Sequence, residues 1–320
     1  MDPVSFLRSS RVVIVAGKGG VGKTTVTAAL ARLAASEGLS TLVVEVEGKS
    51  GLAGLFGRAP LTYRESVLWP AADGGAEVRG RTLTPDEALM EYFEDHGLRR
   101  ISKRLAATGA IDVVSTAVPG IKDILVLGKV KQIERSGAVD LVLLDAPAAG
   151  HAITFLLAAR SLLDAVRVGP ISTQARDVLD LLADPERCSV VLVTIPEETP
   201  VNELVETAFA LEDRVGVKLG PVVVNEVYPL LEGLDVDPEA AAEQAGTSLR
   251  PGEAEALTAA ARFRRERAAL QAEQLERLAE GLPLPQLRLP FLFRADLGPD
   301  EVGQLAGALR ASVAALAPAP

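Results

Sequence analysis

The sequence predicts an α/β fold, in which a mostly parallel sheet of about seven or eight strands is covered by helices on both faces. The main observation is that short apolar runs alternate with helical segments along the chain. Such runs are typical of strands buried on both sides. They occupy residues 12–16, 40–47, 139–145, 188–196 and 220–227. Because strands that alternate with helices form crossover units, we expect them to be parallel.

The segments between these runs have recognisable helix starts and ends. Residues 24–36 are rich in alanine and free of proline and glycine, which predicts a helix that stops near Gly38. Thr84 and Pro85 form a strong helix start, and most of residues 60–138 is expected to be helical, with 110–116 left open. Further elements are expected as helices over 199–214, 251–280 and 299–317, and as a strand within 284–293.

These elements predict a single domain that spans residues 1–320. The chain has 320 residues, 48% of them hydrophobic, which is enough to bury a large core. We expect a helical subdomain, inserted within the domain, from residues of about 60–138 together with about 230–280.

Composition excludes several classes of function. The formal net charge is -10 and there is no long basic run, so we expect no nucleic-acid partner. The single cysteine, Cys188, rules out a disulfide framework within one chain, favours a cytoplasmic location and is expected to be a buried core thiol. The first ten residues do not resemble a signal peptide, and no apolar run is long enough for direct membrane insertion.

A glycine-rich loop follows the first predicted strand. The stretch from Gly17 to Thr24 fits the pattern G-x-x-x-x-G-K-[ST], with a strand leading in and a helix leading out. This is the setting in which backbone N–H groups wrap phosphate oxygens at a helix N-terminus. The predicted phosphate-binding residues are Gly17, Gly19, Gly20, Val21, Gly22, Lys23, Thr24 and Thr25. The alternative is a glycine-rich turn with no ligand.

Individual side chains of this loop have separate expected roles. We expect Lys23 to contact the β- and γ-phosphates and Thr25 to reach the α-phosphate of ATP. The Thr24 hydroxyl is expected to ligate Mg²⁺. A second acidic group for the metal is expected from Asp145, which closes the run at 139–145. The alternative for Asp145 is a helix cap that follows a strand.

Two stretches indicate a family resemblance. "KGGVGKTT", with its additional lysine Lys18, resembles the deviant Walker A motif of the ParA, MinD and nitrogenase-iron-protein class. "DAPAAGH" at 145–151 resembles the switch II segment of the family that holds the arsenite-pump and tail-anchored-protein-targeting ATPases. Further segments at 45–57, 119–130, 193–203, 222–227 and 289–293 agree, so that the resemblance covers nearly the whole chain.

The resemblance implies roles for residues outside the loop. It implies that Lys18 reaches across a dimer interface to the nucleotide of the other subunit. It places Glu47 where the family has an aspartate that positions or deprotonates the attacking water, with Glu45 as a rival. It also implies that Asn225 reads the adenine ring. The expected catalytic set is therefore Lys18, Lys23, Glu47 and Asp145.

The implied function is an Mg²⁺-dependent ATPase that works as a dimeric switch. ATP hydrolysis would open and close a helical surface that binds a hydrophobic protein client or a membrane-protein partner. The dimer is expected to be a homodimer or a heterodimer with a related paralogue. One alternative is a nucleotide-gated binding subunit with little hydrolysis, and another is the energising subunit of an anion pump. The chain lacks the cysteines with which relatives bind zinc or arsenite.

Overall fold

The computed structural model of the chain describes residues 2–46, 51–72, 74–95, 120–147, 149–165 and 170–316. These residues form a nine-stranded sheet in the order β3-β4-β2-β5-β1-β6-β8-β9, with β7 paired to β6 outside this path. The strands are β1 (Val12–Gly17), β2 (Thr41–Val46), β3 (Ser66–Trp69), β4 (Val78–Leu83), β5 (Leu141–Asp145), β6 (Cys188–Thr194), β7 (Lys218–Leu219), β8 (Val222–Val227) and β9 (Gln286–Pro290). Each pairing is parallel except that of β3 with β4. The predicted α/β class is confirmed.

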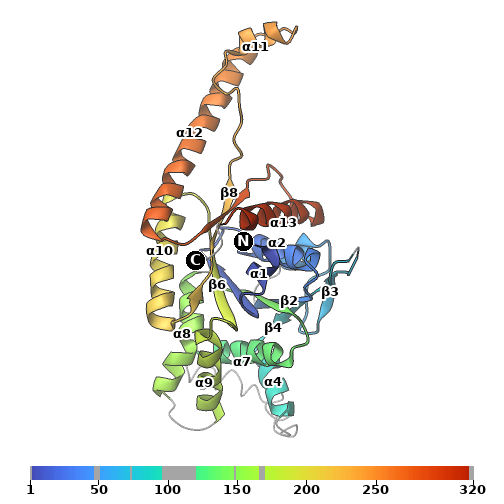
Figure 1. The fold of residues 1–320 in the computed structure, drawn as a ribbon, viewed down its shortest axis with the longest axis vertical. Helices are drawn as coiled ribbons and strands as arrows, with labels where there is room; N and C mark the ends of the chain where they lie inside the picture. Colours follow the sequence, from blue (N-terminus) through green and yellow to red (C-terminus); the bar gives the residue numbers. More distant parts are fainter. Residues whose placement is uncertain are drawn as a thin grey trace.

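Helices cover both faces of this sheet (Figure 1). Alternate residues of each strand point to opposite faces, and the buried apolar side chains form two clusters that follow this alternation. One cluster joins the sheet to α1 (Pro3–Leu7), α2 (Lys23–Ser36), α3 (Leu52–Leu55) and α13 (Pro299–Ala314). The other joins it to α7 (Ile121–Ser136), α8 (Ala149–Ala165), α9 (Pro170–Ala183) and α10 (Glu198–Ala210), with a π-helical turn at Leu211–Val215. The hydrophobic core thus consists of two layers, one on each face of the sheet that contains β1.

The region after residue 60 differs from the prediction in its first part. Residues 66–69 and 78–83 are strands, where helical structure was expected, and they bring the sheet to nine strands among the described residues. The sequence of β4 does not resemble a buried strand, because two arginines, Arg79 and Arg81, interrupt its apolar residues. In the structure, the guanidinium groups of both arginines pair with Glu65 across the hairpin. The predicted helix start is confirmed by α4 (Pro85–Asp95), since Thr84 Oγ1 accepts the Glu87 N–H at 3.2 Å. Residues 110–116 lie outside the described part of the chain.

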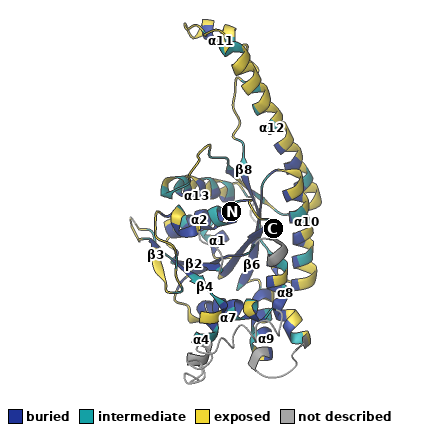
Figure 2. Cartoon of the chain, turned by 180° about the vertical axis from the view of Figure 1, so that it is seen from behind, coloured by how far each residue is buried: buried dark blue, intermediate teal, exposed yellow. Residues whose placement is uncertain are grey.

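A second difference concerns residues 230–280. α11 (Pro238–Gln244) and α12 (Glu253–Gly281) form an arm that projects at the opposite end of the molecule from α4 and α7 (Figures 1 and 2). The described parts of the two regions therefore do not form one helical subdomain. The C-terminal part of α12 packs through buried residues such as Leu275 and Leu278, whereas its N-terminal half is mostly exposed (Figure 2). Within the part of the chain that the structure describes, α12 packs mainly against α10 and α11.

The end of β1 gives a stability prediction. Gly17 has φ +155°, and a Cβ atom there would lie 2.2 Å from the Val193 carbonyl oxygen of the neighbouring strand. Gly17→Ala is therefore expected to lower the free energy of unfolding by about 3 kcal/mol or more, because backbone rather than a flexible side chain must move. Urea unfolding measures the change. Gly307→Ala is the control: it adds a methyl group to α13 in open space and is expected to raise stability by about 0.5–1 kcal/mol. A Gly17→Ala protein of native stability would contradict the prediction.

Candidate nucleotide-binding site

The glycine-rich loop connects the carboxyl end of β1 to the first turn of α2, as predicted. Gly20 and Gly22 have φ of +86° and +85°, a conformation that glycine adopts without strain. Gly22 occupies the N-cap of the 14-residue helix α2, so the N–H groups of its first turn face the loop. An anion held there interacts favourably with the positive end of the helix dipole. Gly19 and Gly20 are exposed, while Val21 is buried under the loop.

The two functional side chains of the first turn already hold defined positions. Lys23 is buried, and its Nζ donates to the Lys18 carbonyl oxygen at 2.7 Å, across the loop. The Thr24 hydroxyl donates to Asp145 Oδ2 at 2.8 Å. Asp145 ends β5, which lies beside β1, and it is fully buried. The structure thus brings together the loop lysine, the hydroxyl and the carboxylate, which sequence analysis placed in one site from distant parts of the chain.

The donor set of Thr24 and Asp145 fits Mg²⁺. Both groups offer oxygen, the ligand that this ion prefers, and two protein ligands suffice where phosphates and waters complete the octahedron. No cluster of three or more acidic, histidine or cysteine residues exists among the described residues that would hold a metal by protein groups alone. The arrangement therefore suits a metal bound together with a nucleotide better than an independent metal centre.

Lys18, the additional lysine of the loop, contacts a helix that lies outside the loop. Its Nζ forms an ion pair of 2.7 Å with Glu203 Oε1 on α10. The Lys18 side chain is 35% exposed and that of Glu203 is 41% exposed, so water weakens this attraction. Glu203 could not be predicted as the partner of Lys18, because the two residues are 185 positions apart and nothing in their spacing links them.

Of the two candidate bases, Glu47 and Glu45, the structure describes only Glu45. Glu47 lies outside the described residues. Glu45 is fully buried on β2 beside Asp145 of β5, and its Oε1 accepts the Leu52 backbone N–H at 3.1 Å. The chain returns at Gly51 close to Thr24, since a Cβ on Gly51 would lie 3.8 Å from Thr24 Cγ2. Glu45 is thus placed to hold this return of the chain near the Thr24 hydroxyl, and its contacts favour that role over the role of base.

Asn225, near the end of β8, contacts the loop directly. Its Nδ2 donates to the Val21 carbonyl oxygen at 3.1 Å, and a Cβ on Gly22 would lie only 2.3 Å from the same nitrogen. The Asn225 side chain therefore supports the glycine-rich loop through this hydrogen bond, a contact that the sequence did not indicate. Its expected role in reading adenine stays a prediction, as does the contact of Thr25 with the α-phosphate.

A parallel sheet with a glycine-rich loop between β1 and α2, and an acid at the end of a neighbouring strand, defines the class of P-loop nucleotide-binding proteins. The model that represents the ArsA ATPase family, described as anion-transporting ATPase, matches residues 10–167. Together with the relative reported next, this match shows that the chain belongs to the anion-transporting ATPase family.

The similar proteins come from bacteria, archaea and fungi. ATPase BagA of Mycobacterium tuberculosis is 34% identical over 258 residues, covering 78% of this chain and 74% of that protein. A Halobacterium salinarum protein, provisionally described as an arsenical pump-driving ATPase, is 24% identical over 315 residues, with 92% of this chain and 44% of that protein covered. ATPase get3 of Schizosaccharomyces japonicus is 27% identical over 148 residues, covering 46% and 44%. The predicted resemblance is therefore confirmed.

Two further expectations concern the rest of the chain. Cys188 is fully buried at the start of β6, and burial raises the pKa of its thiol to about 12, so it is the inert core thiol that was expected. None of the described helices combines the length and the apolar character that a membrane crossing requires.

Proposed function

We propose that the protein is an Mg²⁺-dependent ATPase that works as a dimeric switch. The observation that carries the proposal is the partner of Lys18: it belongs to the glycine-rich loop, yet its ammonium group pairs with Glu203 of α10, whereas that of Lys23 donates to the loop itself. A cation in this position is suited to serve the nucleotide of a second subunit. An ion pair as exposed as that with Glu203 can be exchanged for a phosphate contact at small cost.

Each group of the site has a part in this reaction. The loop N–H groups and Lys23 bind and orient the ATP phosphates. Thr24 and Asp145 would hold Mg²⁺, which neutralises charge on the phosphates when bound. Glu47 orients the attacking water and accepts its proton, and Lys18 of the second subunit stabilises the negative charge on the transferring phosphoryl group. Glu45 positions the chain that returns from Glu47 to Thr24.

The arm supports the second half of the proposal, a surface that binds a partner or client. Of the nine exposed large hydrophobic side chains among the described residues, six lie on the arm or on the segment that leads to it. They are Leu230, Leu231, Val236, Leu257, Phe263 and Leu270. The arm follows directly on β8, whose end holds Asn225 against the loop, so it is connected with the nucleotide site. Exposed apolar side chains along a projecting arm offer contacts to a hydrophobic protein client or a membrane-protein partner.

Mg²⁺-dependent ATP hydrolysis, measured against protein concentration, tests the proposal. We expect the rate per subunit to rise with concentration as dimers form, and to fall by at least about 100-fold in Glu47→Gln. ATP binding, measured by fluorescent-nucleotide titration, should stay within a few-fold of native in the variant.

The opposite result would favour a nucleotide-gated binding subunit with little hydrolysis, which pairs with a related paralogue. Its signature is tight ATP binding with a rate near zero in both proteins at every concentration. That outcome is chemically reasonable because Glu47 is one methylene longer than the family's aspartate, and a base displaced by about 1 Å can lose on the order of 100-fold in rate.

A further inference from the structure

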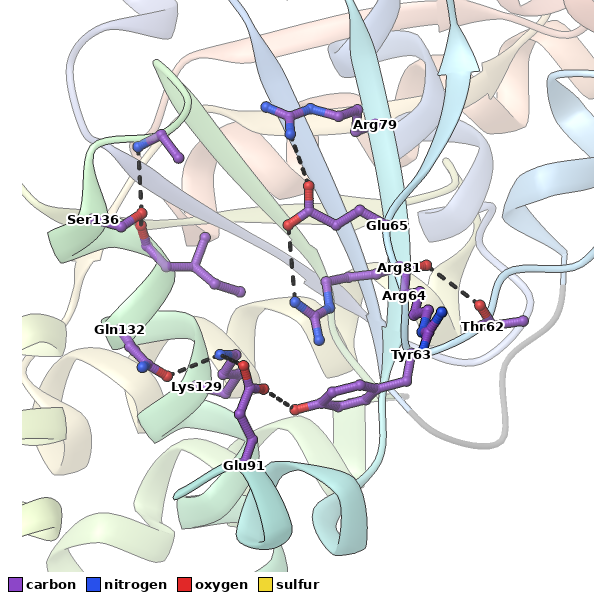
Figure 3. Close-up of polar contacts among 12 residues, drawn as sticks. Thr62, Tyr63, Arg64, Glu65, Arg79, Arg81, Glu91, Lys129, Gln132 and Ser136 are labelled. Carbon is purple, nitrogen blue, oxygen red and sulfur yellow. Dashed lines mark hydrogen bonds and ion pairs between the residues drawn. The ribbon is translucent and has the colours of Figure 1, made fainter. Parts of the chain in front are cut away.

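A polar cavity lies on the other face of the sheet from α2 and away from the glycine-rich loop. It has a volume of about 270 Å³ and is enclosed by β4, the segment before β3, and α7. Figure 3 shows its polar walls: Arg79 and Arg81 come from the strand side, whereas Lys129 and Gln132 come from the α7 side. Glu91 of α4 closes the bottom.

Arg81 is the unusual member of this group. It is 8% exposed, yet it makes no hydrogen bond to any described residue. Its polar contacts there are an ion pair of 3.8 Å with Glu65 and the ring of Tyr63, which its guanidinium carbon approaches to 4.3 Å. A guanidinium has several N–H donors in a rigid fork, and each buried donor without an acceptor costs about 1–3 kcal/mol. Among the described residues, the Nε of this cation is buried without an acceptor, and its terminal nitrogens have only the long ion pair with Glu65.

The neighbouring carboxylates make their shorter contacts with other cations. Glu65 accepts from Arg79 at 2.9 Å, and Glu91 lies 2.6 Å from Lys129 Nζ. Tyr63 also donates to Glu91. Burial raises the pKa of Glu91, but hydrogen bonds from Lys129 and Tyr63 outweigh this effect, so that its pKa lies below the usual range and the group stays ionised. Each of the two carboxylates thus has its shortest contact with a cation other than Arg81, which lies 3.8 Å from Glu65 Oε1.

Lys129 faces the cavity from the opposite side. It is 9% exposed, and its Nζ is bound by Glu91 and, at 2.9 Å, by Gln132 Oε1. An ammonium group has three N–H donors, so these two contacts leave one for a further acceptor. The cavity therefore has surplus donors on both walls, from Arg81 on the strand side and from Lys129 on the helix side.

We propose that this cavity binds a small oxyanion, held between the Arg81 guanidinium and the Lys129 ammonium. A carboxylate or a phosphate group matches the planar fork of arginine, which can donate two parallel N–H bonds to either. The volume, about 270 Å³, admits inorganic phosphate or a short carboxylic acid but not a nucleotide. The ligand would replace the missing acceptors of Arg81 and connect the β3–β4 hairpin with α7.

Isothermal titration with inorganic phosphate, and separately with succinate, tests this proposal in a buffer free of other oxyanions. We expect saturable binding of at least one of the two anions at one site per chain, weakened at least tenfold in Arg81→Gln. Arg79→Gln is the matched control, because Arg79 lies on the same strand and lines the same cavity but is paired with Glu65 and Glu77. It should bind within threefold of native. Arg81→Lys keeps the charge without the fork and should show intermediate affinity.

A second variant separates this cavity from the nucleotide site. Phosphate binding that persists in Lys23→Met and is lost in Arg81→Gln belongs to the cavity. Binding that is lost in Lys23→Met and persists in Arg81→Gln belongs to the glycine-rich loop and overturns the proposal. Absence of saturable binding in the native protein would also overturn it, leaving water as the acceptor for Arg81. Circular dichroism checks that each variant is folded. If Arg81→Gln is misfolded, Arg81→Lys and Lys129→Gln decide instead: Arg81→Lys should show intermediate affinity, and Lys129→Gln should weaken binding at least tenfold.

Discussion

Lys18→Ala is expected to lower the rate of ATP hydrolysis about 1000-fold, while ATP binding stays within a few-fold of native. A cation supplied by a second subunit contributes on this order to phosphoryl transfer, because it stabilises charge that develops only in the transition state. ATP binding is spared because the loop N–H groups and Lys23 remain. Single-turnover hydrolysis and nucleotide titration measure the two quantities separately. Equal losses in binding and in rate would contradict a role limited to the transition state.

Mixing experiments decide whether Lys18 acts within its own subunit or across the dimer. Lys18→Ala keeps an intact Asp145, and Asp145→Asn keeps an intact Lys18. If Lys18 acts across the interface, a mixture of the two inactive proteins regains activity, because each mixed dimer holds one complete site. If Lys18 acts within its own subunit, the mixture stays inactive. Glu203→Gln is the control: it removes the partner of Lys18 but keeps the lysine, so activity should be retained or rise by up to about fivefold.

Asp145→Asn is expected to lower kcat on the order of 100-fold and to raise the Mg²⁺ concentration needed for half-maximal activity. The amide is similar in size and can still accept from the Thr24 hydroxyl, so the fold should be kept. It lacks the negative charge that a hard cation requires. Hydrolysis measured across a Mg²⁺ titration gives both parameters.

Asp140→Asn is the matched control for this experiment. Asp140 immediately precedes the same strand at its other end, where it accepts from the Ser40 hydroxyl at 2.6 Å and backbone N–H at 2.9 Å. These hydrogen bonds, above all that from the Ser40 hydroxyl, lower the pKa of Asp140, so the change should cost stability but leave the Mg²⁺ dependence as it is. A similar shift of the Mg²⁺ dependence in both variants would mean that Asp145→Asn acts by disturbing β5 and not by weakening metal binding.

Much of the nucleotide site could be predicted because its parts are local. The loop from Gly17 to Thr24 is one continuous stretch, and its position between a strand and a helix follows from hydrophobicity and glycine content. Asp145 was found for the same reason, since it ends an apolar strand and the ends of parallel strands meet at one edge. The loop and the strand end are both specified by residues that are neighbours in the sequence, so they can be recognised from one sequence alone.

By itself, then, the sequence determined the fold class, the family, the glycine-rich loop between β1 and α2 and the acid that the Thr24 hydroxyl contacts. Only the tertiary structure decided which distant groups meet: Lys18 with Glu203, Asn225 with Val21, and Arg81 with Lys129 across one polar cavity. It also decided that 78–83 is a strand in spite of its arginines, and that α12 projects as an arm. The reason is physical: hydrophobic periodicity specifies the element a segment forms, whereas the partner of a polar side chain depends on packing between segments far apart in the chain.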